Sequence, residues 1–133
     1  MTTVFLDTSI LIRYFAEDDI PRAVAAAALI DSEASLVLST GVVLEALHVL
    51  RTEYKLANPS LAELLTGLLS RSNIALSDAD KGAVIAAIYW TQGVSSRWIP
   101  DAILAAAAEQ AHVDYLATFD EKFSAPSVAV RRL

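Results

Sequence analysis

The chain has 133 residues, the usual length of one domain, and 55% of them are hydrophobic, while its formal net charge is −6. It has no cysteine and two histidines, which excludes disulfides, thiolate nucleophiles and cysteine-based zinc or iron–sulfur sites. Any metal ion would therefore have to be a hard ion held by carboxylates, which means Mg²⁺ or Mn²⁺. The acidic excess alone does not suggest a nucleic-acid partner, because such proteins usually carry a positive excess.

The apolar content does not predict a membrane protein. The longest unbroken apolar runs, residues 23–30 and 83–90, have 8 residues each, whereas a spanning helix needs about 20. The first residues have no basic region and reach Asp7 at once, unlike a secretory signal. We therefore expect a cytoplasmic protein that makes no use of a membrane.

The first half of the chain alternates short apolar runs with helical patterns. Residues 3–6 predict a buried strand that ends at Asp7, Thr8 and Ser9, which are good helix N-cap residues. Pro21 suits the first turn of a helix. The elements expected next are a helix over 10–15, a helix over 21–30, a strand over 36–38 and a helix over 42–54.

The second half repeats this alternation. Asn58 and Pro59 break the chain, and Ser60 with Glu63 resembles a capping box in front of the next helix. Ser77 resembles the start of a second capping box. The elements expected here are a helix over 61–69, a strand over 74–76, a helix from Ser77 to about Trp90, a polar loop over 93–97, a helix over 100–111, a strand over 113–117 broken by Asp114, a turn or short helix over 118–122 and a final strand over 128–131.

Strands that alternate with helices predict a parallel sheet covered on both faces. We therefore expect an α/β protein, a three-layer α/β/α sandwich of the Rossmann-like kind with a central parallel sheet, in which residues 1–133 form a single domain. Ligands of such sheets bind beyond the carboxyl ends of the strands. Functional side chains are thus expected just after each strand.

Acidic residues occupy these positions. Asp7 and Asp120 directly follow apolar strands, and Asp101 lies in the first turn of the helix that leads into the fourth strand. Each also has a purely structural explanation, since Asp7 and Asp120 could be N-caps and Asp101 could complement the helix dipole.

Glu45 lies near the start of the helix that leaves the second strand. On a helical wheel it falls outside the arc expected to face the core, and periodicity alone predicts that it faces solvent. That arc consists of Val43, Ala46, Leu47 and Leu50.

Taken together, these acids and their neighbours resemble the PIN-domain nucleases, and most closely the VapC toxins of toxin–antitoxin pairs. The resemblance covers nearly the whole chain. One departure is that many relatives have another acid two residues after the last aspartate, where this chain has Lys122. The matching segments are residues 5–9 (Phe-Leu-Asp-Thr-Ser), 43–46 (Val-Leu-Glu-Ala), 99–107 (an Asp before an alanine-rich helix) and 116–123 (which contains Asp120).

The resemblance implies an endoribonuclease toxin that hydrolyses RNA phosphodiester bonds with a metal-activated water, using Mg²⁺ or Mn²⁺. It implies further that a cognate antitoxin protein covers the acidic groove and that the chain forms a homodimer. Ser9 and Thr118 would orient the metal ligands through their hydroxyls. The ligands themselves would be Asp7, Glu45, Asp101 and Asp120.

Arg13, Arg97 and Lys122 are the basic residues best placed to contact RNA phosphates, and scattered surface charge is the alternative reading of each. Two other functions stay open. One is a doubly wound phosphotransfer or phosphatase domain, although Ser9 stands where many such phosphatases have a second aspartate. The other is a catalytically silent PIN-like interaction module.

Overall fold

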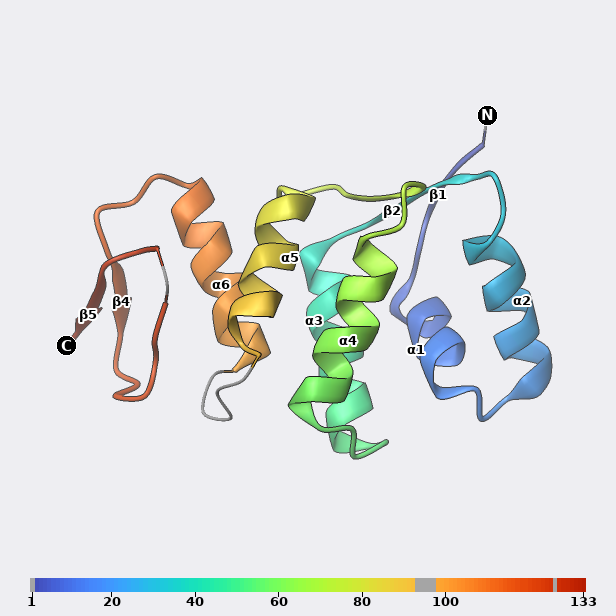
Figure 1. Ribbon diagram of the computed structural model, residues 1–133, viewed down its shortest axis with the longest axis horizontal. Helices are drawn as coiled ribbons and strands as arrows, with labels where there is room; N and C mark the ends of the chain where they lie inside the picture. Colours follow the sequence, from blue (N-terminus) through green and yellow to red (C-terminus); the bar gives the residue numbers. More distant parts are fainter. Residues whose placement is uncertain (1, 93–97, 126) are drawn as a thin grey trace. The chain divides into compact units, whose positions relative to one another are not determined.

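The structure, a computed structural model, describes residues 2–92, 98–125 and 127–133 (Figure 1). The loop expected over 93–97, including Arg97, lies outside the described residues. The chain divides into two compact units, Met1–Asp78 and Ala79–Leu133.

The first unit alternates strands with helices, as the sequence predicts. Its strands form a parallel sheet in the order β1-β2-β3, with Thr3 beside Ser35 and Leu36 beside Ile74. In chain order its elements are β1 (Thr3–Phe5), α1 (Thr8–Ala16), α2 (Ile20–Ile30), β2 (Ser35–Leu38), α3 (Thr40–Thr52), α4 (Asn58–Leu69) and β3 (Ile74–Leu76).

The core of this unit follows the hydrophobic pattern. In α3 the buried residues are the four expected from the helical wheel, Val43, Ala46, Leu47 and Leu50. Helix α1 packs against α2 and α3, and α3 packs against α4. Burying each of the valine and leucine side chains contributes about 1.5–3 kcal/mol relative to leaving it in water, so burial of this face of α3 is strongly favoured.

Some helices begin earlier than expected, because the residue before them caps the first turn. Helix α1 begins at Thr8 rather than at residue 10, since the Asp7 side chain accepts a hydrogen bond from the Ser9 N–H. Helix α3 begins at Thr40 rather than at residue 42, since the Ser39 hydroxyl caps it.

Both expected capping boxes are wrong. Helix α4 begins at Asn58, and Pro59 lies in its first turn, where its missing N–H leaves no hydrogen bond unmade. Ser60 is thus inside the helix. In the second unit, the helix expected to begin at Ser77 begins at Lys81, because the Asp80 carboxylate accepts a hydrogen bond from the Ala83 N–H.

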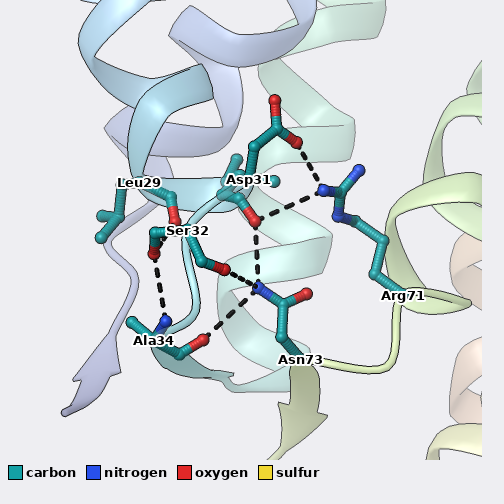
Figure 2. A network of polar contacts seen from close by, with 7 residues as sticks. Leu29, Asp31, Ser32, Ala34, Arg71 and Asn73 are labelled. Carbon is teal, nitrogen blue, oxygen red and sulfur yellow. Dashed lines mark hydrogen bonds and ion pairs between the residues drawn. The ribbon is translucent and has the colours of Figure 1, made fainter. Parts of the chain in front are cut away.

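A polar network joins the end of α2 to the start of β3 (Figure 2). The Asn73 side-chain amide donates to the Ile30 carbonyl at 3.0 Å and to the Ala34 carbonyl at 3.4 Å. Arg71 forms an ion pair with Asp31. These contacts satisfy carbonyls at a helix C-terminus, which have no partner within the helix itself, and they hold the turn that leads into β2.

The second unit contains two helices and two strands. Helices α5 (Lys81–Trp90) and α6 (Ile99–Gln110) pack through an alanine-rich contact, whose buried members are Ala87, Ala102 and Ala106, with Trp90 against them. Strands β4 (Leu116–Thr118) and β5 (Val130–Arg132) pair in parallel, with Leu116 beside Val130.

These two strands differ from the ranges expected over 113–117 and 128–131. His112 adopts a left-handed backbone conformation (φ 55°) just after α6. The ladder then starts at Leu116, whose N–H donates to the Ala129 carbonyl at 2.8 Å. Val113 and Asp114 are exposed and precede the strand, so Asp114 does not interrupt it.

Candidate functional site

Asp7 directly follows β1 and caps α1. Its Oδ2 atom accepts hydrogen bonds from the Ser9 hydroxyl at 2.7 Å and from the Ser9 N–H at 3.2 Å. The hydroxyl bond, followed by the backbone bond, lowers the pKa of Asp7 below its usual value. Asp7 is therefore an exposed, ionised carboxylate in a defined orientation.

Glu45 faces solvent from α3, on the side turned towards the start of α1. The hydroxyl of the buried Thr8 donates a hydrogen bond to Glu45 Oε2 at 3.2 Å. Thr8 follows Asp7 in the chain, so this bond brings the second acid to the end of β1.

Asp7 and Glu45 line one groove of about 320 Å³. The walls come from the start of α1 and from the outer face and end of α3. Its lining residues are Asp7, Thr8, Ser9, Ile12, Arg13, Glu45, Val49, Glu53 and Tyr54.

Asp101 and Asp120 form a second acidic pair, within the second unit. Asp101 lies in the first turn of α6 and is partly buried. Burial raises the pKa of Asp101, and the negative charge of Asp120 raises it further. Asp101 is thus close enough to Asp120 to be affected by its negative charge, and a bound cation would relieve this repulsion.

A tight turn after β4 holds Asp120. Its N–H donates to the Thr118 hydroxyl at 3.0 Å, and its Oδ1 atom accepts from the Lys122 N–H at 2.9 Å. The Lys122 side chain is exposed. Asp120 therefore caps its own turn, and residues 121–125 and 127–133 form no helix.

The structure thus brings Asp7 together with Glu45, and Asp101 together with Asp120. Within residues 2–92, 98–125 and 127–133, no three histidine, cysteine, aspartate or glutamate side chains form a group that could hold a metal ion. The chemistry of the donors nevertheless fits a hard divalent cation, since each pair offers carboxylate oxygens, the ligands that Mg²⁺ and Mn²⁺ prefer.

Sequence reasoning missed three polar residues of the first unit. Asp78 follows β3 and accepts hydrogen bonds from the Thr40 N–H at 2.9 Å and from the Thr40 hydroxyl at 2.8 Å. Its place just after a strand was the signal that could have identified it. Asp18 and Tyr54, which meet beside Arg13, carried no such signal because 36 residues separate them.

Comparison with known proteins gives one match. A family model described as the PIN domain matches residues 4–128, which lie in both units. No curated protein sequence matches the chain. A search of the described residues for a helix long and apolar enough to cross a membrane finds none.

The family match also bears on the fold and on the chemistry. The helices and parallel strands of the two units agree with a three-layer α/β/α PIN fold, which confirms the predicted fold class. PIN domains are typically nucleases that depend on divalent metal ions such as Mg²⁺. Since the PIN-domain family model matches most of the length of the chain, the chain belongs to the PIN-domain family.

Proposed function

We propose that the chain is an endoribonuclease that hydrolyses RNA phosphodiester bonds with Mg²⁺ or Mn²⁺ held by Asp7, Glu45, Asp101 and Asp120. The observation that carries the proposal is that carboxylates pair within each unit, just after β1 in the first unit and just after β4 in the second. The carboxyl ends of the strands are where an α/β sheet presents its ligand site. When bound, a divalent ion would lower the pKa of a water molecule and stabilise charge on phosphate oxygens.

The chain's own residues orient the ligands. The Ser9 hydroxyl and N–H hold one oxygen of Asp7, and the Thr8 hydroxyl holds one oxygen of Glu45. Thr118 and the Lys122 N–H set the turn from which the Asp120 carboxylate projects. Fixed carboxylates lose little freedom when a metal binds, which favours both affinity and geometry. Arg13 and Lys122, together with Arg97, would contact RNA phosphates.

The test is RNA cleavage by the purified chain. We expect a structured RNA such as transfer RNA to be cut with Mg²⁺ or Mn²⁺ and to stay intact with EDTA. Asp7→Asn and Asp101→Asn should each reduce cleavage about a hundredfold or more. Asp114→Asn, a change at an exposed acid outside both pairs, should leave it unchanged. Cleavage that survives EDTA or Asp101→Asn would refute the mechanism, and labelling of the protein by a phosphate donor would favour a phosphotransfer domain.

We further propose that the enzyme is a toxin of the cytoplasm, that it forms a homodimer and that a cognate antitoxin inhibits it. Ile20 and Val24, one turn apart on α2, are 65% and 63% exposed, which is apolar surface suited to a protein partner. Light scattering should give twice the chain mass. Induced expression should arrest growth, and co-expression of the small protein encoded next to it should restore growth. A monomer, or harmless expression of active enzyme, would contradict this part.

A further inference from the structure

Arg13 contributes a positive charge to the groove that Asp7 and Glu45 line. Among the described residues that line this groove, Arg13 is the only cation, and the ionisable acids beside it are Asp7, Glu45 and Glu53. RNA carries a negatively charged phosphate at every nucleotide. An RNA strand in a groove lined with carboxylates therefore needs a cationic side chain to offset the repulsion between phosphate and carboxylate.

The Arg13 guanidinium is held through one oxygen of Asp18. Nη1 of Arg13 lies 3.0 Å from Asp18 Oδ1, and the Tyr54 hydroxyl donates to Asp18 Oδ2 at 2.7 Å. Arginine and carboxylate often form two parallel hydrogen bonds. Because Tyr54 engages the second oxygen, the described contact uses a single N–H, and the planar guanidinium keeps other donors for another anion.

Two unusual backbone conformations hold this arrangement. Glu17, which precedes Asp18, and Lys55, which follows Tyr54, both have left-handed backbones, with φ of 56° and 60°. Holding a residue that has a Cβ atom in the left-handed backbone conformation costs about 1–2 kcal/mol. Both turns that carry the contact therefore adopt conformations that the surrounding structure must stabilise.

The protonation states agree with this geometry. The hydrogen bond from Tyr54 is the largest cause of a lowered pKa at Asp18, and the same bond raises the pKa of Tyr54 above its usual value. At neutral pH the phenol is therefore a donor and the carboxylate is ionised.

We propose that Asp18 and Tyr54 are positioning residues for Arg13: Tyr54 withdraws one Asp18 oxygen, so that Arg13 is oriented by Asp18 yet remains able to bind a phosphodiester of RNA in the groove beside Asp7 and Glu45. This inference rests on the proposed function. Without the Tyr54 hydroxyl, both Asp18 oxygens can form a bidentate ion pair with Arg13, and Asp18 then competes with the RNA phosphate for the Arg13 guanidinium.

The experiment compares Tyr54→Phe with Tyr89→Phe, its control at an exposed tyrosine of α5. With labelled transfer RNA and Mn²⁺, Tyr54→Phe should raise KM about three- to tenfold and leave kcat within about twofold, because it weakens binding without touching the carboxylates. Tyr89→Phe should change neither constant. A purely structural role for Tyr54 would lower kcat or the amount of folded enzyme and would not raise KM alone.

A double-mutant cycle tests the route through Arg13. Arg13→Gln should raise KM, and adding Tyr54→Phe to it should have no further effect. RNA binding is measured in the Asp101→Asn background to prevent cleavage. The slope of the logarithm of the binding constant against the logarithm of the salt concentration should be smaller in magnitude by about 0.7 for Arg13→Gln, as expected for one lost phosphate contact to a single strand.

The outcomes separate the two proposals. If the unmodified chain cleaves RNA but Tyr54→Phe matches Tyr89→Phe, or if its effect persists with Arg13→Gln, the positioning role is wrong and the nuclease stands. If the unmodified chain neither cleaves nor binds RNA with Mg²⁺ or Mn²⁺, both proposals fail.

Discussion

The Thr8 hydroxyl donates a hydrogen bond to Glu45 Oε2 at 3.2 Å, across a separation of 37 residues. Thr8 is the first residue of α1 and is buried, whereas Glu45 is exposed on α3. The bond therefore orients a surface carboxylate from within the protein, next to the aspartate that caps α1.

Replacing Thr8 with Val keeps the shape of the side chain and removes this hydroxyl. We expect a loss of about 1 kcal/mol in the free energy of unfolding, together with weaker Mn²⁺ binding, because Glu45 loses its orientation. The measurement is the rise in Tm on titration with Mn²⁺. Thr66→Val is the matched control, since the buried Thr66 hydroxyl donates to the Ala62 carbonyl within α4. It should lower Tm and leave the rise caused by Mn²⁺ intact. An equal response in both variants would contradict a role for Thr8 at the metal site.

Metal binding itself should stabilise the fold. An ion at about 100 times its Kd contributes about 2.7 kcal/mol, which corresponds to about 10 °C in Tm for a chain of this size. Asp7→Asn should abolish most of that rise while changing Tm little in EDTA, because asparagine caps a helix about as well as aspartate. Asp114→Asn should retain the full rise. A melting curve that does not respond to millimolar Mn²⁺ would count against the carboxylate site.

Much of the fold follows from local pattern, and the exceptions have local causes. The wheel of α3 predicts its four buried residues because a helix places every third or fourth side chain on one face. The start of α4 was missed because Ser60 and Glu63 form a capping pattern, whereas Pro59 fits the first turn equally well and brings the start forward to Asn58.

The candidate site is predictable only in part, for a different reason. Asp7, Asp101 and Asp120 are conspicuous because they stand next to predicted strand ends or helix starts. Asp7 and Asp120 are held by neighbours two residues away in the chain. Glu45 and Asp18, in contrast, are oriented by partners distant in sequence, Thr8 and Tyr54 respectively. Hydrophobic periodicity says nothing about such pairs, and it assigns Glu45 only to the solvent face.

Asp78 should make stability depend on pH. Its hydrogen bonds from the Thr40 N–H, and then from the Thr40 hydroxyl, hold its pKa below the usual 3.8. Because the folded pKa is the lower one, the stabilisation is present above pH 3.8 and is lost as the pH falls through the folded value. Asp78→Ala should cost about 1 kcal/mol at pH 7, as for loss of a cap.

The measurement is urea unfolding of Asp78→Ala and of the unmodified chain at pH 7 and at pH 2.5. The difference in unfolding free energy between them should shrink at the lower pH. Asp114→Ala, at an exposed residue, should show a much smaller difference at both pH values. A difference for Asp78→Ala that does not change with pH would mean that its carboxylate does not act through these bonds.

Arg132 holds the turn that carries Asp120. Its guanidinium donates to the Glu121 carbonyl at 3.2 Å and to the Phe123 carbonyl, and both acceptors lie in the segment that follows β4. Arg131, its neighbour on β5, instead lies over the Tyr115 ring, 3.8 Å from the ring centre. Adjacent arginines of one strand therefore point to different partners, and they form a matched pair of test positions.

Arg132→Gln should loosen the Asp120 turn, because two carbonyls lose a charged donor, and each such bond contributes about 1.5–3 kcal/mol. Amide hydrogen exchange reports this directly. The Phe123 N–H, which donates to the Asp120 carbonyl, and the Lys122 N–H, which donates to Asp120 Oδ1, should both exchange faster. Arg131→Gln should leave these two amides unchanged, since it removes only the contact with Tyr115. If both variants speed exchange equally, the effect comes from the pairing of β4 with β5, and Arg132 has no separate part in holding Asp120.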